Sequence, residues 1–71
     1  MDTADIAAVD STFVLLTVEE AARRLRIGRT TCYGLIRSGE LESVPVGRLR
    51  RVPADAPAAY VTRLRAAKRA A

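Results

Sequence analysis

The sequence has 71 residues, too few for more than one domain. So short a chain buries only about 60% of its unfolded surface on folding. The core must therefore be small, with little room for a catalytic cleft. The single cysteine excludes an internal disulfide. The sequence has no histidine, so it lacks the commonest acid–base residue and the commonest zinc ligand, which argues against a zinc site. The net charge is +4, and eleven of the twelve basic residues are arginine, whose planar fork suits phosphate groups and guanine edges.

Residues 1–12 carry three aspartates and show no sustained periodicity, so we expect a flexible N-terminal arm ahead of one folded domain over residues 13–71. The acidic start lacks the basic and apolar regions of a secretory signal. The apolar run "FVLL" at residues 13–16 is far shorter than the roughly 20 residues that span a bilayer. We therefore expect a cytoplasmic protein that does not enter membranes, with residues 13–16 as a short extended segment.

The first helix is predicted over residues 18–25. In "TVEE", Thr17 stands at the N-cap and Glu20 follows three residues later, which is the spacing of a capping box. Glu19 and Glu20 also suit the positive end of the helix dipole, and because adjacent helix positions do not face each other, they are not interpreted as a catalytic pair. Apolar residues at i, i+3, i+4 and i+7 predict one buried stripe, which comprises Val18, Ala21, Ala22 and Leu25.

The tripeptide "RIG" interrupts this pattern, and a second helix is predicted over residues 29–38. Gly28 or Arg29 begins it, and Gly39 is placed to end it in a left-handed conformation. Its inner stripe comprises Cys32, Leu35 and Ile36, with Cys32 interpreted as a small buried hydrophobe. The opposite stripe comprises Thr30, Tyr33, Gly34 and Arg37.

Two short strands are predicted to form a hairpin near residues 42–52, with Gly47 at its tip. Pro45 lacks an amide donor, so its strand should be an edge or bulged strand. Pro53 is expected to close the hairpin and to open a third helix near residues 54–68, where Pro57 is tolerable only in the first turn. The inner side of this helix is predicted to comprise Ala56, Tyr60, Val61 and Leu64.

Two short helices joined by a three-residue turn are typical of a helix-turn-helix, in which the first helix braces the second and the second enters the major groove of DNA. An arginine-bearing hairpin directly after it is typical of a wing. The predicted fold is therefore mainly α with a small β-hairpin, a single-domain winged helix-turn-helix. The charge distribution favours nucleic acid as the partner: residues 1–28 carry three basic and five acidic groups, a net −2, and residues 29–71 carry nine and three, a net +6.

The candidate DNA-binding residues lie on the second helix and the hairpin: Arg29, Thr30, Thr31, Tyr33, Arg37, Arg48, Arg50 and Arg51. The residues alone leave other roles open. The first three could serve only in solvation and helix capping, Tyr33 could cover a gap in a small core, and Arg37 could merely compensate the helix dipole. Because side chains alternate along a strand, Arg48 and Arg50 share a face, and we favour them over Arg51.

The stretch "LLTVEEAARRLRIGRTTCYGLIRSGELESVPVGRLRRVPADAPAAYV" resembles the excisionase-type, MerR-like winged helix-turn-helix family. The family pattern is a threonine-capped helix, a turn, an Arg-x-Thr-x-Tyr recognition helix, a Gly-Glu-Leu link, a Val-Gly-Arg-x-Arg wing and a closing helix. The chain departs from it at Gly28, where a serine cap is usual, and at Gly34, where a long polar side chain is common. Loss of that side chain removes a base contact and lets the backbone approach DNA.

The resemblance implies an excisionase, also called a recombination directionality factor, which binds and bends double-stranded DNA near an attachment site and directs an integrase toward excision of a phage or integrative element. We also expect a monomer in free solution and cooperative self-association on DNA, because the chain shows no long dimerisation helix and one module buries only roughly 600–1,000 Å² on DNA. The alternative is a small transcriptional regulator of the same fold, although the long dimerisation helix of MerR-type activators is missing. The positive outer stripe argues against a pure protein-interaction module. An enzyme is not expected, since the sequence offers no nucleophile–base pair, metal cluster or phosphate loop, and no cofactor is expected.

Overall fold

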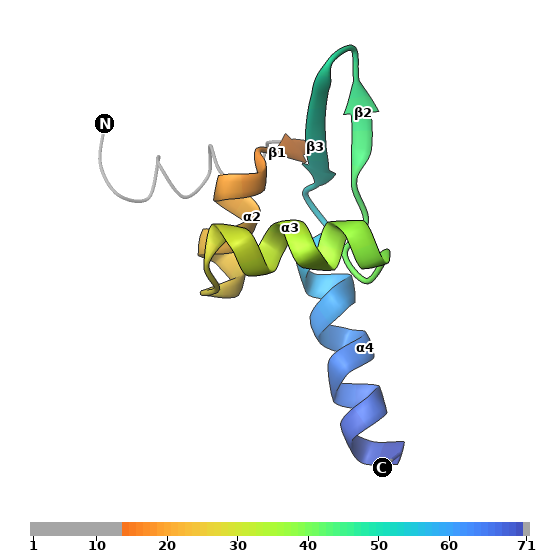
Figure 1. The fold of residues 1–71 in the computed structure, drawn as a ribbon. Coiled ribbons are helices and arrows are strands. Elements are labelled where there is room, and N and C mark those ends of the chain that lie inside the picture. Colours follow the sequence, from red (N-terminus) through yellow and green to blue (C-terminus); the bar gives the residue numbers. More distant parts are fainter. Residues whose placement is uncertain (1–13, 71) are drawn as a thin grey trace, which may run out of the picture.

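The computed structural model describes residues 14–70, so the arm predicted for residues 1–12 lies outside the described residues. The elements follow in the order β1 (Leu15–Leu16), α2 (Val18–Leu25), α3 (Arg29–Ser38), β2 (Val44–Val46), β3 (Leu49–Pro53) and α4 (Ala56–Ala70) (Figure 1). This architecture confirms the predicted class, mainly α with a small β-hairpin. The first two helices have the predicted bounds, and α4 begins two residues later than expected.

Helix α2 begins with the capping box that its sequence predicts. The Thr17 hydroxyl accepts a hydrogen bond from the Glu20 amide at 3.0 Å, and the Glu20 carboxylate accepts one from the Thr17 amide at 2.8 Å. These bonds satisfy two amide groups that a helix start otherwise leaves without partners. They also lower the pKa of the Glu20 carboxyl, since the amide of Thr17 favours its charged form.

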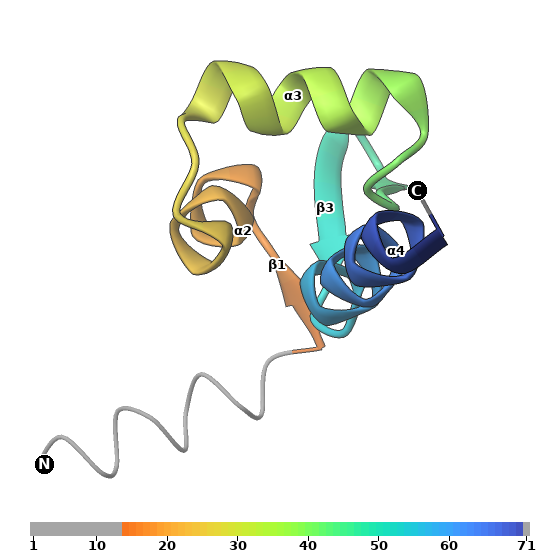
Figure 2. The same cartoon turned by 90° about the horizontal axis from the view of Figure 1, so that it is seen from below.

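The turn between α2 and α3 places Arg26 in the left-handed region, with φ 59° and ψ 42°. Ile27 then packs against the core, and Gly28 is the N-cap of α3 in an extended conformation without a side-chain hydrogen bond. Gly39 ends α3 at φ 83°, as predicted. The chain therefore turns sharply at both ends of α3, and Figure 2 shows α3 lying across α2 at a steep angle.

The three strands form one sheet in the order β1-β3-β2. β2 is an edge strand, which explains how it accommodates Pro45. The expectation that Pro53 opens the third helix is wrong, because Pro53 is the last residue of β3 and pairs with Leu15. The ladder continues one step further, where the Ala54 amide donates to the Val14 carbonyl at 2.8 Å, and this added pairing delays the helix to Ala56.

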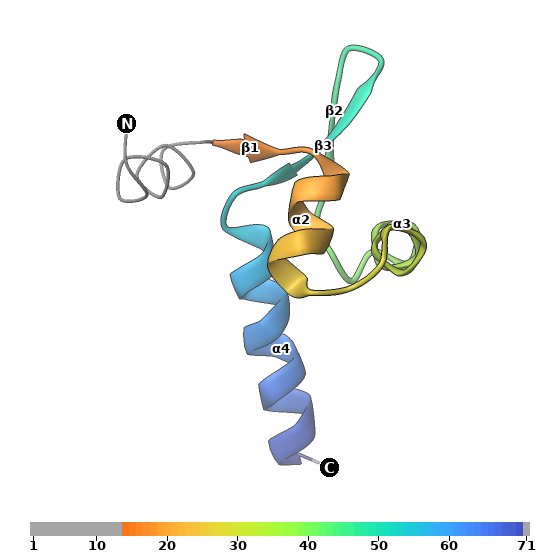
Figure 3. The same cartoon turned by 90° about the vertical axis from the view of Figure 1, so that its left-hand side faces the viewer.

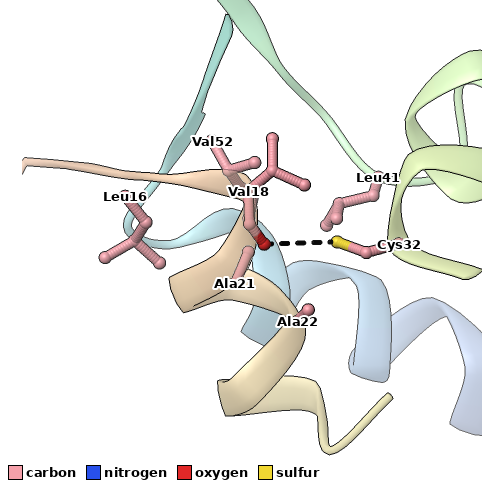
Figure 4. Close-up of a cluster of buried hydrophobic side chains, with 8 residues drawn as sticks. Leu16, Val18, Ala21, Ala22, Cys32, Leu41 and Val52 are labelled. Atoms are coloured by element: carbon pink, nitrogen blue, oxygen red, sulfur yellow. Dashed lines mark hydrogen bonds between the residues drawn. The ribbon is translucent and has the colours of Figure 1, made fainter. Parts of the chain in front are cut away.

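The core is a small cluster of apolar side chains between α2, α3, β3 and the start of α4 (Figure 4). Its buried members are Leu16, Val18, Ala21, Ala22, Cys32, Leu41, Val52 and Ala56. Cys32 is fully buried, as predicted, and its Sγ lies 3.7 Å from the Val18 carbonyl oxygen. Burial raises the pKa of this thiol, because a thiolate would lose its hydration there.

Helix α4 extends well beyond the body of the protein (Figure 1). Ala56 and Pro57 in its first turn are buried, and Tyr60 packs partly against the core. The prediction that Val61 and Leu64 point inward is wrong: they are 40% and 47% exposed. This part of α4 contacts the body through a hydrogen bond from the Arg63 guanidinium to the Glu40 carbonyl. None of the helices formed by residues 14–70 has the length and apolar character needed to cross a membrane.

Candidate nucleic-acid interface

Helix α3 and the wing, which is the hairpin of β2 and β3, lie on the same side of the molecule. Figure 3 looks along α3 and shows the wing rising above it, with α2 beside α3 and α4 extending away below. Cys32 holds the inner face of α3 on α2, and Leu35 and Ile36 pack partly against the same core. The opposite face of α3 is therefore available to a partner that also meets the wing.

Arg29, the first residue of α3, is held by two neighbours. Its Nε donates to the Glu19 Oε2 of α2 at 2.6 Å, and its guanidinium lies 4.9 Å from the centroid of the Tyr33 ring. The hydrogen bond lowers the pKa of the Glu19 carboxyl and raises that of the Arg29 guanidinium, since each charge favours the other. Sequence reasoning gave Glu19 only a dipole role, and no spacing rule links residues ten positions apart on different helices.

Tyr33 has the structural role that the sequence left open beside DNA contact, and it also contacts Arg29. Its ring is half-buried and packs against the core, while the ring also carries the Arg29 guanidinium. A cation held over an aromatic ring gains electrostatic attraction and loses side-chain freedom. Tyr33 thus links the core to the outer face of α3.

The remaining candidates on α3 are exposed: Thr30, Thr31 and Arg37. Within residues 14–70, the Arg37 side chain makes no ion pair or hydrogen bond. As far as these residues go, its guanidinium donors are available to a ligand. Gly34 lies one position after Tyr33, and a Cβ added to it would meet nothing within 4 Å. The outer face of α3 is consequently polar and cationic, and it has no protruding side chain at Gly34, near its middle.

The three wing arginines occupy different positions. Arg48 is exposed and lies in the turn after Gly47, whose φ is 61°, so strand alternation does not govern its direction. Arg50 is exposed and its Nη1 donates to the Ser43 hydroxyl at 3.3 Å. Arg51 is half-buried and donates to the Arg50 carbonyl at 3.1 Å.

The strand register places Arg50 and Arg51 on opposite faces of the wing. Arg50 is paired with Pro45, and Arg51 with Val44. Near the tip, the cross-strand pair of Val46 and Leu49 is 45% and 53% exposed. The wing tip therefore offers an arginine beside a small apolar surface.

Cations and hydroxyl groups gathered on one helix face and an adjoining hairpin suit an anionic, hydrogen-bonding surface such as duplex DNA. Metal chemistry has no comparable basis in residues 14–70, where no group of three or more Cys, Asp or Glu side chains could hold an ion. On this face Arg29 forms an ion pair with Glu19. Among residues 14–70, the side chains gathered on this face are mainly cations and hydroxyl groups, which suit binding of an anionic surface.

Comparison with known proteins gave a match of residues 15–65 to the family model of the helix-turn-helix domain. A Saccharopolyspora erythraea protein named "Probable excisionase" is 59% identical over 58 residues, which cover 82% of this chain and 59% of that protein. An excisionase of Streptomyces ambofaciens is 50% identical over 42 residues, 59% of this chain and 68% of that protein. A Mycobacterium tuberculosis protein named for DNA binding is 42% identical over 55 residues, 78% of this chain and 70% of that protein.

The match thus spans about three-fifths of the length of the first of these relatives. No significant match was found among the solved structures.

Proposed function

Because the chain belongs to the helix-turn-helix domain family and is related to excisionases, we propose that it is a sequence-specific DNA-binding excisionase. It binds and bends DNA near an attachment site and directs an integrase toward excision of a phage or integrative element. The observation that carries the proposal is the cationic outer face of α3 beside an arginine-bearing wing. This role requires binding and positioning of DNA and no catalytic group.

On DNA, α3 enters the major groove with its N-terminal residues toward the base edges. Arg29 reads a guanine, and Thr30 and Thr31 contact bases or the adjoining phosphates. Tyr33 contacts the DNA with the exposed part of its ring. Arg37, near the end of α3, binds phosphate.

The wing supplies affinity that depends little on sequence. Arg48 and Arg50 contact phosphate or the minor groove, and Arg51 has a smaller share because it is half-buried and bonded to the backbone. The supporting fact is their position on a narrow hairpin next to α3 (Figure 3).

Affinity useful for recombination requires several copies. A single module of this size covers roughly 600–1,000 Å² on DNA, so neighbouring copies bind cooperatively. The net charge is −2 over residues 1–28 and +6 over residues 29–71, which favours head-to-tail contact. Such a contact builds a row along DNA and not a closed dimer, and free protein is monomeric.

The second candidate is a small transcriptional regulator with the same DNA-binding surface. It is favoured by the M. tuberculosis relative, whose name describes DNA binding without excision. The two functions differ in the DNA sites that they use and not in the chemistry of α3.

Footprinting on the ends of the genetic element that carries the gene tests the proposal. Protection of phased repeats beside an attachment site supports an excisionase, and an excision assay with the integrase of that element then checks the direction of recombination. Protection of a single promoter operator, with excision unaffected by the protein, contradicts the excisionase and supports the regulator.

A further inference from the structure

Glu19 is the acidic side chain paired with the outer face of α3, and it comes from the other helix of the motif. Its Oε2 accepts the Nε hydrogen of Arg29 at 2.6 Å. Arg29 is one of the residues proposed to read DNA. A carboxylate at a DNA-binding face lowers affinity for every phosphate backbone, so its presence there calls for a compensating role.

The ion pair with Arg29 does not supply that role through stability, and the favourable place of Glu19 at the start of the α2 dipole does not need the bond to Arg29. The Arg29 and Glu19 side chains are 64% and 48% exposed, and ion pairs this exposed contribute little to folding because water screens them. Glu19 also lies beside the capping box without being part of it, since Thr17 and Glu20 complete that motif. The effect of Glu19 therefore falls on the position of Arg29.

The atoms involved show how Glu19 acts. The bond to Glu19 uses Nε of the guanidinium and leaves the two terminal nitrogens, Nη1 and Nη2, outside that contact. The Tyr33 ring lies against the guanidinium at 4.9 Å and limits rotation of its plane. Those terminal nitrogens form a planar pair of donors, which matches the O6 and N7 acceptors of guanine.

We propose that Glu19 is a positioning residue for base recognition: together with Tyr33 it fixes Arg29 so that its terminal nitrogens read guanine, and its charge disfavours binding to other DNA. Glu19 thereby lowers the affinity for DNA in general and raises the preference for the target sequence. The inference rests on the proposed DNA-binding function and adds a specificity-determining residue on the bracing helix.

The test compares dissociation constants for two duplexes at one salt concentration. One is selected by the wild-type chain from a random-sequence pool, and the other has the same composition in scrambled order. Glu19→Gln removes the charge, and Glu19→Asp keeps the charge but shortens the reach to Arg29. Glu42→Gln, at an exposed carboxylate before the wing, removes the same charge elsewhere.

We expect Glu19→Gln to reduce the preference for the selected duplex by about two- to fivefold, the range that couplings of exposed ion pairs span, and to strengthen binding to the scrambled duplex. Glu19→Asp should reduce the preference with little change in binding to the scrambled duplex. Glu42→Gln should leave the preference unchanged. In an Arg29→Ala background, Glu19→Gln should produce no further loss of preference.

An unchanged preference in both Glu19 variants, with folding confirmed by circular dichroism, overturns the inference while the DNA-binding function stands. An equal loss in the Arg29→Ala background overturns it as well, because Glu19 would then act through another residue. If the wild-type chain selects no duplex at all, the proposed function fails and this inference fails with it.

Discussion

The Cys32 Sγ of α3 lies 3.7 Å from the Val18 carbonyl oxygen of α2, with both side chains buried in the contact between the two helices (Figure 4). Val18 begins α2 and Cys32 is in the first half of α3, so the contact fixes the helices where they cross. A small side chain is needed at this point because the two backbones approach closely. The outer face of α3, which is proposed to bind DNA, depends on this buried contact for its orientation.

Cys32→Leu should destabilise the fold by about 1–3 kcal/mol, because the added atoms have no space in a fully buried site. Cys32→Ala should cost less, about 1 kcal/mol, since it removes one buried atom without forcing the helices apart. Urea unfolding followed by circular dichroism measures both values. Equal stability of Cys32→Leu and the wild type would show that the crossing is loosely packed.

Arg26→Gly should stabilise the protein by about 1 kcal/mol, because Arg26 adopts φ 59°, where a side chain clashes with its own backbone and glycine does not. Arg23→Gly is the matched control, since the same substitution in the last turn of α2 should destabilise by about 0.5–1 kcal/mol. Thermal unfolding of the two variants compares these opposite signs. A loss of stability in both would mean that Arg26 makes a contribution outweighing its strain.

Gly34→Ala should raise the free energy of unfolding by about 0.5–1 kcal/mol, because glycine is costly inside a helix and the added Cβ meets no atom within 4 Å. Affinity for the selected duplex should fall at the same time, since the glycine is proposed to let the backbone of α3 approach DNA. Unfolding and binding measurements on one preparation separate the two effects. Unaltered DNA binding would place the DNA farther from the middle of α3.

Arg48→Ala and Arg50→Ala should each weaken binding to all sequences and reduce the slope of log affinity against log salt by about one unit. Arg51→Ala should have a smaller effect, because that side chain is half-buried against the backbone of the wing. Arg65→Ala on α4 removes an equal charge outside the proposed interface and serves as the control. A salt slope that falls as much in Arg65→Ala as in the wing variants would contradict the assignment.

Probes carrying one, two and three sites should show affinity per site rising with site number, because copies are proposed to contact one another along DNA. Gel-shift titrations measure this cooperativity, and sedimentation should give a monomer in the absence of DNA. Independent filling of the three sites would favour the regulator over the excisionase.

Local sequence was enough to predict the parts of the fold that depend on near neighbours. The capping box of Thr17 and Glu20 and the glycine stop at Gly39 are formed by residues three or four positions apart, and both occur as expected. The expectation for Pro53 is wrong because its conformation is decided by pairing with Leu15, 38 positions earlier in the sequence. No local pattern contains that information.

The candidate site shows the same division. The periodicity of α3 places Thr30 and Arg37 on its outer stripe, and both are exposed, whereas Tyr33 and Gly34 on the same stripe are half-buried. The pairing of Arg29 with Glu19 depends on how α2 crosses α3 and was not predictable from spacing. Val61 and Leu64 lie at positions expected for an apolar helical stripe, but they are exposed. Periodicity cannot predict that α4 extends beyond the rest of the fold.

The sharing of β3 between the wing and the core sheet has a consequence for how DNA is chosen. The outer half of β3 pairs with β2, while Val52 and Pro53 at its base pair with β1, so the root of the wing is fastened to the same framework as α3. Such a framework holds α3 and the wing, the two proposed DNA contacts, at a fixed separation. A bound double helix must then adjust its shape to that separation. We therefore expect a preference for duplexes whose flexible base steps allow that adjustment at low energy, even at positions that no side chain reaches.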